Sequence, residues 1–109
     1  MKKIKKKGIE KMELLNKKCI FRGDRSGVFF GTLLEKNGQE VAIGKCRRLW
    51  YWDGACSLNE IAKIGTTKPE NCKFTVTVDE ITILDCIEII PCTEKAAEVI
   101  ESVEEWKKS

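Results

Sequence analysis

Arginines and aromatic rings are the residues of this chain best suited to chemistry. Two arginines lie at the glycine-containing turn of residues 22–27, and two more open the run RRLWYW at residues 47–52. A guanidinium binds phosphate oxygens through two parallel hydrogen bonds, and a flat ring stacks on a nucleobase, which contributes about 1–3 kcal/mol per base. The sequence therefore predicts a site for a small anionic nucleotide. Its expected ligand-binding residues are Arg47, Arg48, Tyr51, Trp52, Arg22 and Arg25.

Within this site, Arg47 and Arg48 are expected to contact phosphates, and Tyr51 is expected to stack on a base. Alternate side chains of a strand point to opposite faces, so each face of this run carries one guanidinium beside aromatic rings. The alternative is that the tryptophans fill the core while an arginine pairs with Asp85 or Asp53. The sequence alone leaves both interpretations open.

Catalytic groups are scarce. The 109 residues include no histidine, which excludes serine triads, Cys-His dyads and histidine metal sites. The carboxylates of residues 79–88 follow no spacing typical of an acid-base pair or a magnesium site, and we expect them to be solvated. We therefore expect a protein that is not an enzyme, needs no cofactor, and binds its ligand without changing it.

Six cysteines are spaced in a way that does not suit a metal site or a disulfide framework. No two of them form a CxxC pair, and the nearest pair, Cys86 and Cys92, is six residues apart. No apolar segment typical of a signal peptide follows the lysine-rich start. The sequence predicts reduced thiols in the cytoplasm, no metal, and cysteines that mostly act as small buried hydrophobic residues. A zinc site assembled from distant strands is the alternative.

Charge is distributed unevenly along the chain. The net charge is +6 over residues 1–18, +3 over residues 19–78 and −6 over residues 79–109. A basic start and an acidic end can pair within one chain or between two, or can both be solvated. The acidic end would repel a polyanion, and no recognised nucleic-acid motif accompanies the lysines. Nucleic-acid binding is therefore not expected.

The pattern of the chain predicts one domain in three regions. Residues 1–18 form a basic extension or a short helix, residues 19–92 a β-rich domain, and residues 93–109 a C-terminal helix of the same domain. The predicted fold class is α+β, mainly β: a curved antiparallel sheet or small open barrel of five to six strands, with one short inserted helix and the C-terminal helix. No run of about 18 apolar residues is present, so no membrane contact is expected.

Turn and capping residues position the smaller elements. Asn37-Gly38 predicts a tight hairpin between two strands. Ser57 with Glu60 predicts the capping box that begins the short inserted helix, because each side chain can satisfy a backbone N–H of the other.

Apolar periodicity predicts the later elements. The alternation of CKFTVTV at residues 72–78 is typical of a half-exposed strand, and ITILDCIEII reads as one long final strand. Asp85 interrupts the apolar parity of that strand, so we expect it at a bulge or bound by a partner. The apolar stripe of residues 96–106 predicts the C-terminal helix.

Three segments carry a resemblance to a known family. They are FFGTLLEKNGQEV, RRLWYWDGACSLNEIA and IEIIPCTEKA, and the similarity extends from about residue 20 to residue 95. In these segments the chain resembles a family of small, uncharacterised phage and prophage proteins with no assigned enzymatic reaction. The resemblance implies no catalytic residues. It implies a phage setting, in which small proteins without catalytic motifs often bind components of host defence.

In a phage setting, the arginine and aromatic set is similar in kind to the sites of phage sponge proteins. We therefore expect a phage-encoded anti-defence protein that sequesters a cyclic nucleotide or cyclic ADP-ribose type immune signal in the host cytoplasm without cleaving it. A subunit interface often closes over such a ligand, and the stripe of residues 96–106 would suit a homo-oligomer. The alternatives are a protein-binding inhibitor of a host defence effector or nuclease, and a small nucleic-acid-binding protein led by the lysines.

Overall fold

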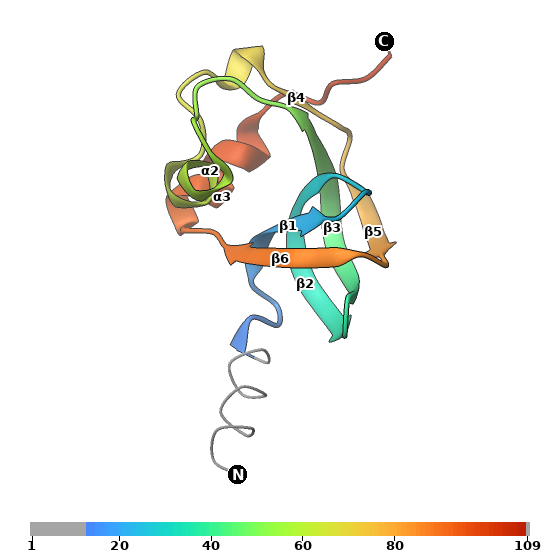
Figure 1. Cartoon of the computed structure of the whole chain (residues 1–109). Helices are drawn as coiled ribbons and strands as arrows, with labels where there is room; N and C mark the ends of the chain where they lie inside the picture. The colour runs from blue at the N-terminus through green and yellow to red at the C-terminus, as the bar shows by residue number, and fades with distance from the viewer. Residues whose placement is uncertain (1–12, 109) are drawn as a thin grey trace.

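β-Strands dominate the part of the chain that the structure describes, residues 13–108 of a computed structural model (Figure 1). The strands are β1 (Lys18–Gly23), β2 (Val28–Asn37), β3 (Glu40–Tyr51), β4 (Lys73–Phe74), β5 (Val78–Ile83) and β6 (Cys86–Pro91). The helices are α2 (Leu58–Ile64), the 3-10 helix η1 (Pro69–Asn71) and α3 (Glu94–Ser102).

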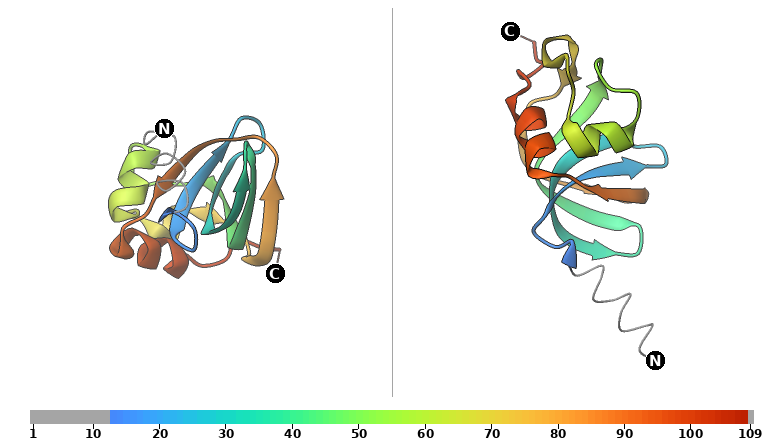
Figure 2. Two further views of the ribbon diagram at one scale, coloured as in Figure 1. Left: turned by 90° about the horizontal axis from the view of Figure 1, so that it is seen from below. Right: turned by 90° about the vertical axis from the view of Figure 1, so that its left-hand side faces the viewer.

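The strands form one strongly curved antiparallel sheet that does not close on itself (Figure 2). The order is β4-β3-β2-β1-β6. The long strand β3 pairs with β5 along its first half and with β4 near its end. The predicted fold class is confirmed: the described residues form a mainly β, α+β fold with six antiparallel strands, a short inserted helix and a helix near the C-terminus.

An irregularity bends the ladder between β2 and β3. The pairing register shifts between Phe30 and Thr32. A β-bulge increases local twist and allows a small sheet to curl around its own core. Gly31 lies at this shift, and a Cβ atom added there would stand 2.7 Å from the backbone oxygen of Gly44. The close approach of the two strands therefore requires a residue without a side chain at position 31.

The curled sheet separates two apolar cores, because successive side chains of a strand point to opposite faces. Phe21 and Phe29 lie in the inner core, whereas their chain neighbours Ile20 and Phe30 face the helices. The inner core comprises Cys19, Phe21, Phe29, Leu33, Val41, Ile43, Cys46, Ile83 and Cys86. The second core comprises Ile20, Phe30, Leu49, Ile61, Ala62, Phe74, Ala97, Ile100 and Val103. Helices α2 and α3 lie side by side and cover this second core (Figure 2).

The predicted hairpin and capping box are both confirmed. The two-residue loop between β2 and β3 is Gly38-Gln39, one residue later than the sequence suggested, and Gly38 has a positive φ of 62°. At the start of α2, the backbone N–H of Glu60 donates to Ser57 Oγ at 3.2 Å. The Glu60 carboxylate in turn accepts from the backbone N–H of Cys56 at 2.7 Å.

Two predicted strands are shorter than expected. The run ITILDCIEII is divided into β5 and β6, which are separated at Leu84 and Asp85. Of the predicted strand at residues 72–78, only β4 and Val78, the first residue of β5, are strand residues. Thr75 still donates its backbone N–H to the Arg48 carbonyl of β3 at 3.0 Å, whereas the backbone N–H of Thr77 donates to the side chain of Glu105 at 3.2 Å and so interrupts the ladder.

The predicted basic extension or short helix of residues 1–18 falls mostly on residues 1–12, which lie outside the described residues. Strand β1 begins at Lys18, the last residue of that predicted region. Between residues 13 and 108, no helix is both long and apolar enough to cross a membrane.

Asp85 connects the turn between β5 and β6 to the turn between β1 and β2. Its Oδ2 accepts hydrogen bonds from the backbone N–H groups of Arg25 (2.7 Å) and Ser26 (3.0 Å), and its Oδ1 accepts from the Ser26 hydroxyl (2.6 Å). The expectation that a partner binds Asp85 is confirmed, although the partners are amides and a hydroxyl. These bonds, that of the Ser26 hydroxyl first, hold the pKa of Asp85 below its ordinary value.

The lowered pKa makes this contact sensitive to acid. Asp85 stabilises the fold above the unfolded pKa of about 3.9 and loses that contribution as the pH falls through its lower folded pKa. We expect Asp85→Asn to lower the urea midpoint at about pH 6 and to match the parent at about pH 2. Asp79→Asn is the control, since the Asp79 side chain is fully exposed. Equal midpoints for the parent and Asp85→Asn at the higher pH would contradict this role.

Candidate functional site

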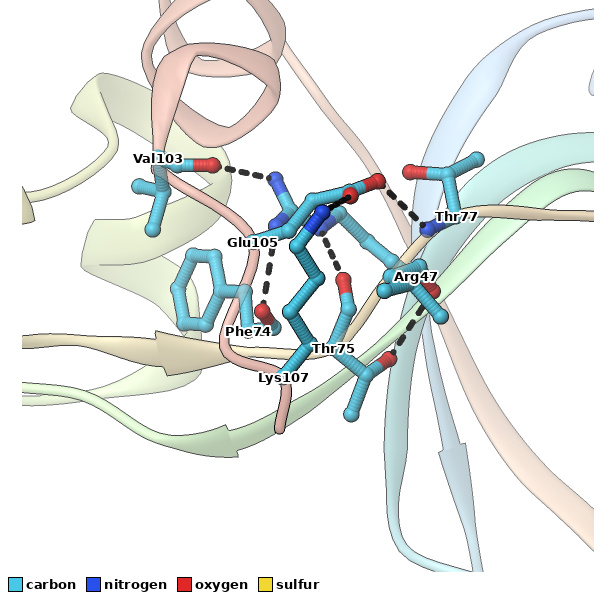
Figure 3. Close-up of polar contacts among 8 residues, drawn as sticks. Arg47, Phe74, Thr75, Thr77, Val103, Glu105 and Lys107 are labelled. Carbon is cyan, nitrogen blue, oxygen red and sulfur yellow. Dashed lines mark hydrogen bonds and ion pairs between the residues drawn. The ribbon is translucent and has the colours of Figure 1, made fainter. Parts of the chain in front are cut away.

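Arg47 is buried where β3, β4 and the end of α3 meet (Figure 3). Only 3% of the residue is exposed. Its guanidinium donates four hydrogen bonds, all to backbone carbonyls. The acceptors are Thr75 for Nε (3.0 Å), Phe74 for Nη2 (3.1 Å), and both Ile100 and Val103 for Nη1 (2.9 Å each).

This burial is not compatible with the phosphate contact predicted for Arg47. A phosphate could reach the guanidinium only by displacing the backbone carbonyls that occupy it. Burial lowers the pKa of Arg47, and the nearby Glu105 carboxylate partly offsets that effect. Arg47 therefore joins the end of α3 to β4 and, with 3% of the residue exposed, is not part of the solvent-facing surface.

Arg48 lies on the opposite face of β3 and is exposed. Its guanidinium carbon is 4.7 Å from the centroid of the Phe29 ring, which is a cation-π distance. Its backbone N–H donates to Thr75 Oγ1 at 2.8 Å. The side chain is thus held over the rim of the inner core with its guanidinium open to solvent, and the phosphate contact predicted for Arg48 stays a prediction.

Arg22 and Arg25 lie apart from Arg48. Arg22 pairs across the ladder with Val28, whereas Arg48 pairs with Phe29, so the two guanidinium groups project from opposite faces of the sheet. Arg22 Nε is 3.1 Å from Glu88 Oε1 in an exposed ion pair. Arg25 is exposed in the β1–β2 turn. The structure therefore does not bring the four arginines together.

The aromatic residues after Arg48 differ in their surroundings. Tyr51, at the end of β3, pairs with Lys73 and is 49% exposed. Trp52 is half-buried and packs against the second core. The alternative that tryptophans fill the core thus holds for Trp52, whereas Tyr51 remains accessible for stacking. Trp50 is the most accessible of the three, at 59% exposed.

Trp50 belongs to an exposed cluster that the spacing of residues along the chain does not predict. Its ring centroid is 5.1 Å from that of Trp106, with 31° between the ring planes. The Lys73 ammonium lies 5.7 Å from the Trp50 centroid and 5.6 Å from the Trp106 centroid. We call Trp50, Trp106 and Lys73 the tryptophan surface. It presents two indole rings and a cation to solvent.

Trp106 reaches this surface because α3 ends early. The prediction of a helix over residues 93–109 is too long: α3 ends at Ser102, and Val103 already has extended backbone angles. The chain then runs parallel to β4, where Glu105 forms an isolated β-bridge with Phe74. The backbone N–H of Trp106 donates to the Phe74 carbonyl at 2.8 Å. The apolar stripe signalled that Trp106 packs against something, but its partner is a strand residue.

Arg47 positions this terminal segment. The same guanidinium binds the carbonyl of Val103, where the segment begins, and the carbonyl of Phe74, to which the segment pairs. The Glu105 carboxylate adds a bond from the backbone N–H of Thr77 at 3.2 Å (Figure 3). The buried arginine thus determines where Trp106 lies relative to Trp50.

Trp106 lines two open cavities whose other lining residues differ in charge. One, of about 390 Å³, is lined by Thr75, Trp106, Lys107 and Lys108. The other, of about 420 Å³, is lined by residues of η1 and of the segment after α3, including Glu70 and Glu104. The lysine-lined side is the one suited to an anion.

The cysteines are not gathered at this surface. Burial raises the pKa of Cys19 to about 11 and those of Cys46 and Cys92 to about 12. Thiols with such pKa values are almost entirely protonated near neutral pH and react slowly as nucleophiles. No group of three or more cysteine, aspartate or glutamate side chains within residues 13–108 is placed to hold a metal ion.

The arrangement at the tryptophan surface can bind a flat ring and neutralise negative charge. An exposed indole offers a π-face to a planar partner, and ammonium groups beside it offer point charges to phosphate oxygens. These are the two functions that the sequence assigned to Tyr51 and to the arginines. In the structure, other residues also bring an aromatic face and a cation together: Trp50, Trp106 and Lys73.

Comparisons with known proteins place the chain in a family. No curated protein and no solved structure matches it. A family model matches residues 16–100, from just before β1 to within α3, so Trp106 and the lysines after it lie beyond the match. The predicted resemblance to an uncharacterised family is confirmed at that level. The chain belongs to the family described as a domain of unknown function, DUF6948.

Proposed function

We propose that this protein binds a nucleotide, or another anion that carries a planar ring, without transforming it. The observation that supports the proposal is the pairing of two exposed indoles with a lysine ammonium that lies within 6 Å of both ring centroids. Exposed tryptophans that touch each other are costly in water, and such patches are typical of binding surfaces. The charge beside them favours an anionic partner.

The residues of the proposed site differ from the ligand-binding residues that the sequence predicted. Trp50 and Trp106 would stack on the base, while Lys73 and the lysines of the 390 Å³ cavity would neutralise phosphates. Arg48 is the arginine that can still contribute, since its side chain is exposed and it precedes Trp50 by two residues on β3. Tyr51 borders the surface through its pairing with Lys73.

The proposed setting is a phage infection. There the protein would act as an anti-defence protein in the host cytoplasm that sequesters a cyclic nucleotide or cyclic ADP-ribose type signal. Sequestration needs tight binding, and an open surface reaches it more readily when a second copy covers the ligand. A homo-oligomer that closes over the tryptophan surface is therefore part of this proposal.

Ligand binding is tested by calorimetry and thermal shift with cyclic dinucleotides, cyclic trinucleotides and cyclic ADP-ribose isomers. We expect one class to bind and to be recovered intact by chromatography. Trp50→Leu should weaken binding by about 5- to 150-fold, the loss of one stacked base. Arg22→Ala is the control and should keep the affinity, since Arg22 projects from the other face of the sheet. Cleavage of the ligand would contradict the proposal.

A second candidate function is binding of a protein, such as a host defence effector or nuclease. Trp and Tyr are the residues most often found at the energetic centre of protein interfaces, and Trp50, Trp106 and Tyr51 are all about half exposed. This candidate predicts that none of the nucleotides above binds, while the same Trp50→Leu change weakens capture of the partner protein.

A further inference from the structure

The tryptophan surface is open on its outer side. Trp50 is 59% and Trp106 is 44% exposed, and the lysine-lined cavity beside them opens to solvent. Sites for free small molecules are usually concave pockets that bury about 70–90% of the ligand's surface. A free nucleotide bound to one copy of this chain would keep much of its surface in water.

The affinity available to a single nucleotide is correspondingly small. One stacked base raises affinity by about 5- to 150-fold. An exposed ion pair adds at most about fivefold. Micromolar binding requires a factor of roughly 10⁶ relative to the 1 M standard state. A ligand that repeats the unit of base and phosphate can add several such contributions, whereas a mononucleotide cannot.

Three neighbouring chain segments repeat aromatic rings and cations across this surface. Strand β3 contributes Trp50, β4 contributes Lys73, and the segment beside β4 contributes Trp106 followed by Lys107 and Lys108. The two indole rings converge to 5.1 Å and share the Lys73 ammonium, whereas Lys107 and Lys108 follow Trp106 along the segment that continues beyond β4. The surface is therefore one aromatic platform, from which two further cations continue along the chain.

Pairing neutralises part of the acidic end of the chain, whereas Glu104, which lines the other cavity beside Trp106, forms no ion pair within residues 13–108. The Glu101 carboxylate is 2.8 Å from the Lys18 ammonium, away from the tryptophan surface. The Glu105 carboxylate accepts from the backbone of Thr77 and lies 3.7 Å from Lys107. Within residues 13–108, Lys73 and Lys108 form no ion pair. The repulsion that the sequence suggested is thus partly neutralised by pairing.

We propose that the tryptophan surface binds single-stranded nucleic acid, with bases stacked on Trp50 and Trp106 and phosphates beside Lys73, Lys107 and Lys108. The inference rests on the proposed function, since it names the class of ligand that the same site takes. A single strand exposes the faces of its bases, whereas a duplex keeps them stacked on one another. The surface therefore selects single strands over duplexes.

The test titrates the full chain with an oligothymidylate of about eight nucleotides, with thymidine monophosphate, and with a duplex of the same length, following tryptophan fluorescence. We expect the oligonucleotide to bind at least about tenfold more tightly than the monophosphate or the duplex. With three lysines neutralising phosphates, log K should fall with log salt concentration with a slope of about −2.

Charge variants test the arrangement. The double variant Lys107→Ala/Lys108→Ala should reduce the salt slope by about 1.4, the contribution of two phosphates on a single strand. Lys95→Ala removes a lysine from the opposite end of α3 and should leave the slope unchanged. Trp106→Leu should weaken binding by about 5- to 150-fold, with Trp106→Phe retaining part of it.

The outcomes separate this inference from the proposed function. If the monophosphate or a cyclic nucleotide binds as tightly as the oligonucleotide, or the duplex binds equally well, the single-strand inference is overturned and nucleotide binding stands. If no nucleotide of any length binds, both are overturned. If the double variant Lys107→Ala/Lys108→Ala left the slope of log K against log salt concentration unchanged, the placement of phosphates beside these two lysines would be overturned.

Discussion

Replacing Arg47 by methionine is expected to destabilise the fold by about 3–5 kcal/mol. Methionine can fill part of the volume but cannot donate to the carbonyls that the guanidinium binds. Phe74 O retains the N–H of Trp106 and Ile100 O retains that of Val103, whereas no second backbone donor is found for Thr75 O or Val103 O within residues 13–108. Leaving each buried carbonyl unpaired costs about 1–3 kcal/mol. Urea unfolding followed by far-UV circular dichroism measures the loss.

The neighbouring arginine provides a matched control. Arg48→Met removes the same group one residue later, but Arg48 is exposed and its guanidinium donates no hydrogen bond within the described residues, so we expect a loss of less than about 1 kcal/mol. Equal destabilisation by the two variants would show that the side chain of Arg47 is not the internal connection inferred above.

A second readout distinguishes positioning from general stability. The two indoles are 5.1 Å apart, close enough for exciton coupling in circular dichroism. Because Arg47 holds the segment that carries Trp106, Arg47→Met should lose this signal under conditions where the sheet remains folded. Trp106→Leu should lose the same signal without the loss of stability. A folded Arg47→Met protein that keeps the exciton signal would contradict the positioning role.

Gly31→Ala is the second substitution with a large expected effect and should lower the free energy of unfolding by about 3 kcal/mol. The added Cβ atom would lie 2.5 Å from Ile43 Cγ2, 2.7 Å from the Gly44 carbonyl oxygen and 3.2 Å from Cys46 Cα. Two of these atoms belong to the backbone of β3, so the strand itself has to move. The bulge between β2 and β3 would open, and the inner core beneath it would lose its packing. Thermal and urea unfolding both measure this cost.

Gly44→Ala is the matched control on the facing strand. The three atoms nearest to its Cβ would all belong to the side chain of Leu34, with Cδ1 at 2.9 Å. Leu34 is 42% exposed and can rotate away into solvent, so we expect a cost below about 1 kcal/mol. If Gly44→Ala proved as harmful as Gly31→Ala, close backbone approach would not explain the glycine at position 31.

Local patterns were sufficient for most of the fold. The hairpin at Gly38 and the capping box at Ser57 depend on residues within four positions of one another, and both are present. The strands depend on apolar alternation, which is again local. The errors arose at ends: residues 72–78 were expected to continue β4, and α3 was expected to continue beyond Ser102. Those ends are decided by contacts with Arg48, Glu105 and Phe74, which are distant in sequence.

The candidate site was harder to predict because it depends on which face of a strand is covered. Alternation placed Arg47 and Arg48 on opposite faces of β3 but could not identify the buried one. That choice follows from α3, whose last carbonyls reach over the face that carries Arg47. Nothing in the sequence around Arg47 indicates that its guanidinium would bind four backbone carbonyls from distant residues.

The sequence by itself determined the class of the protein: a small, mainly β fold with an inserted helix and a helix near its C-terminus, without histidine chemistry. It did so because periodicity, turns and caps act over a few residues. Only the tertiary structure decided that Arg47 is internal and that Trp50, Lys73 and Trp106 lie together. These three residues come from segments separated by more than twenty positions each, and only the packing of the second core brings the segments side by side.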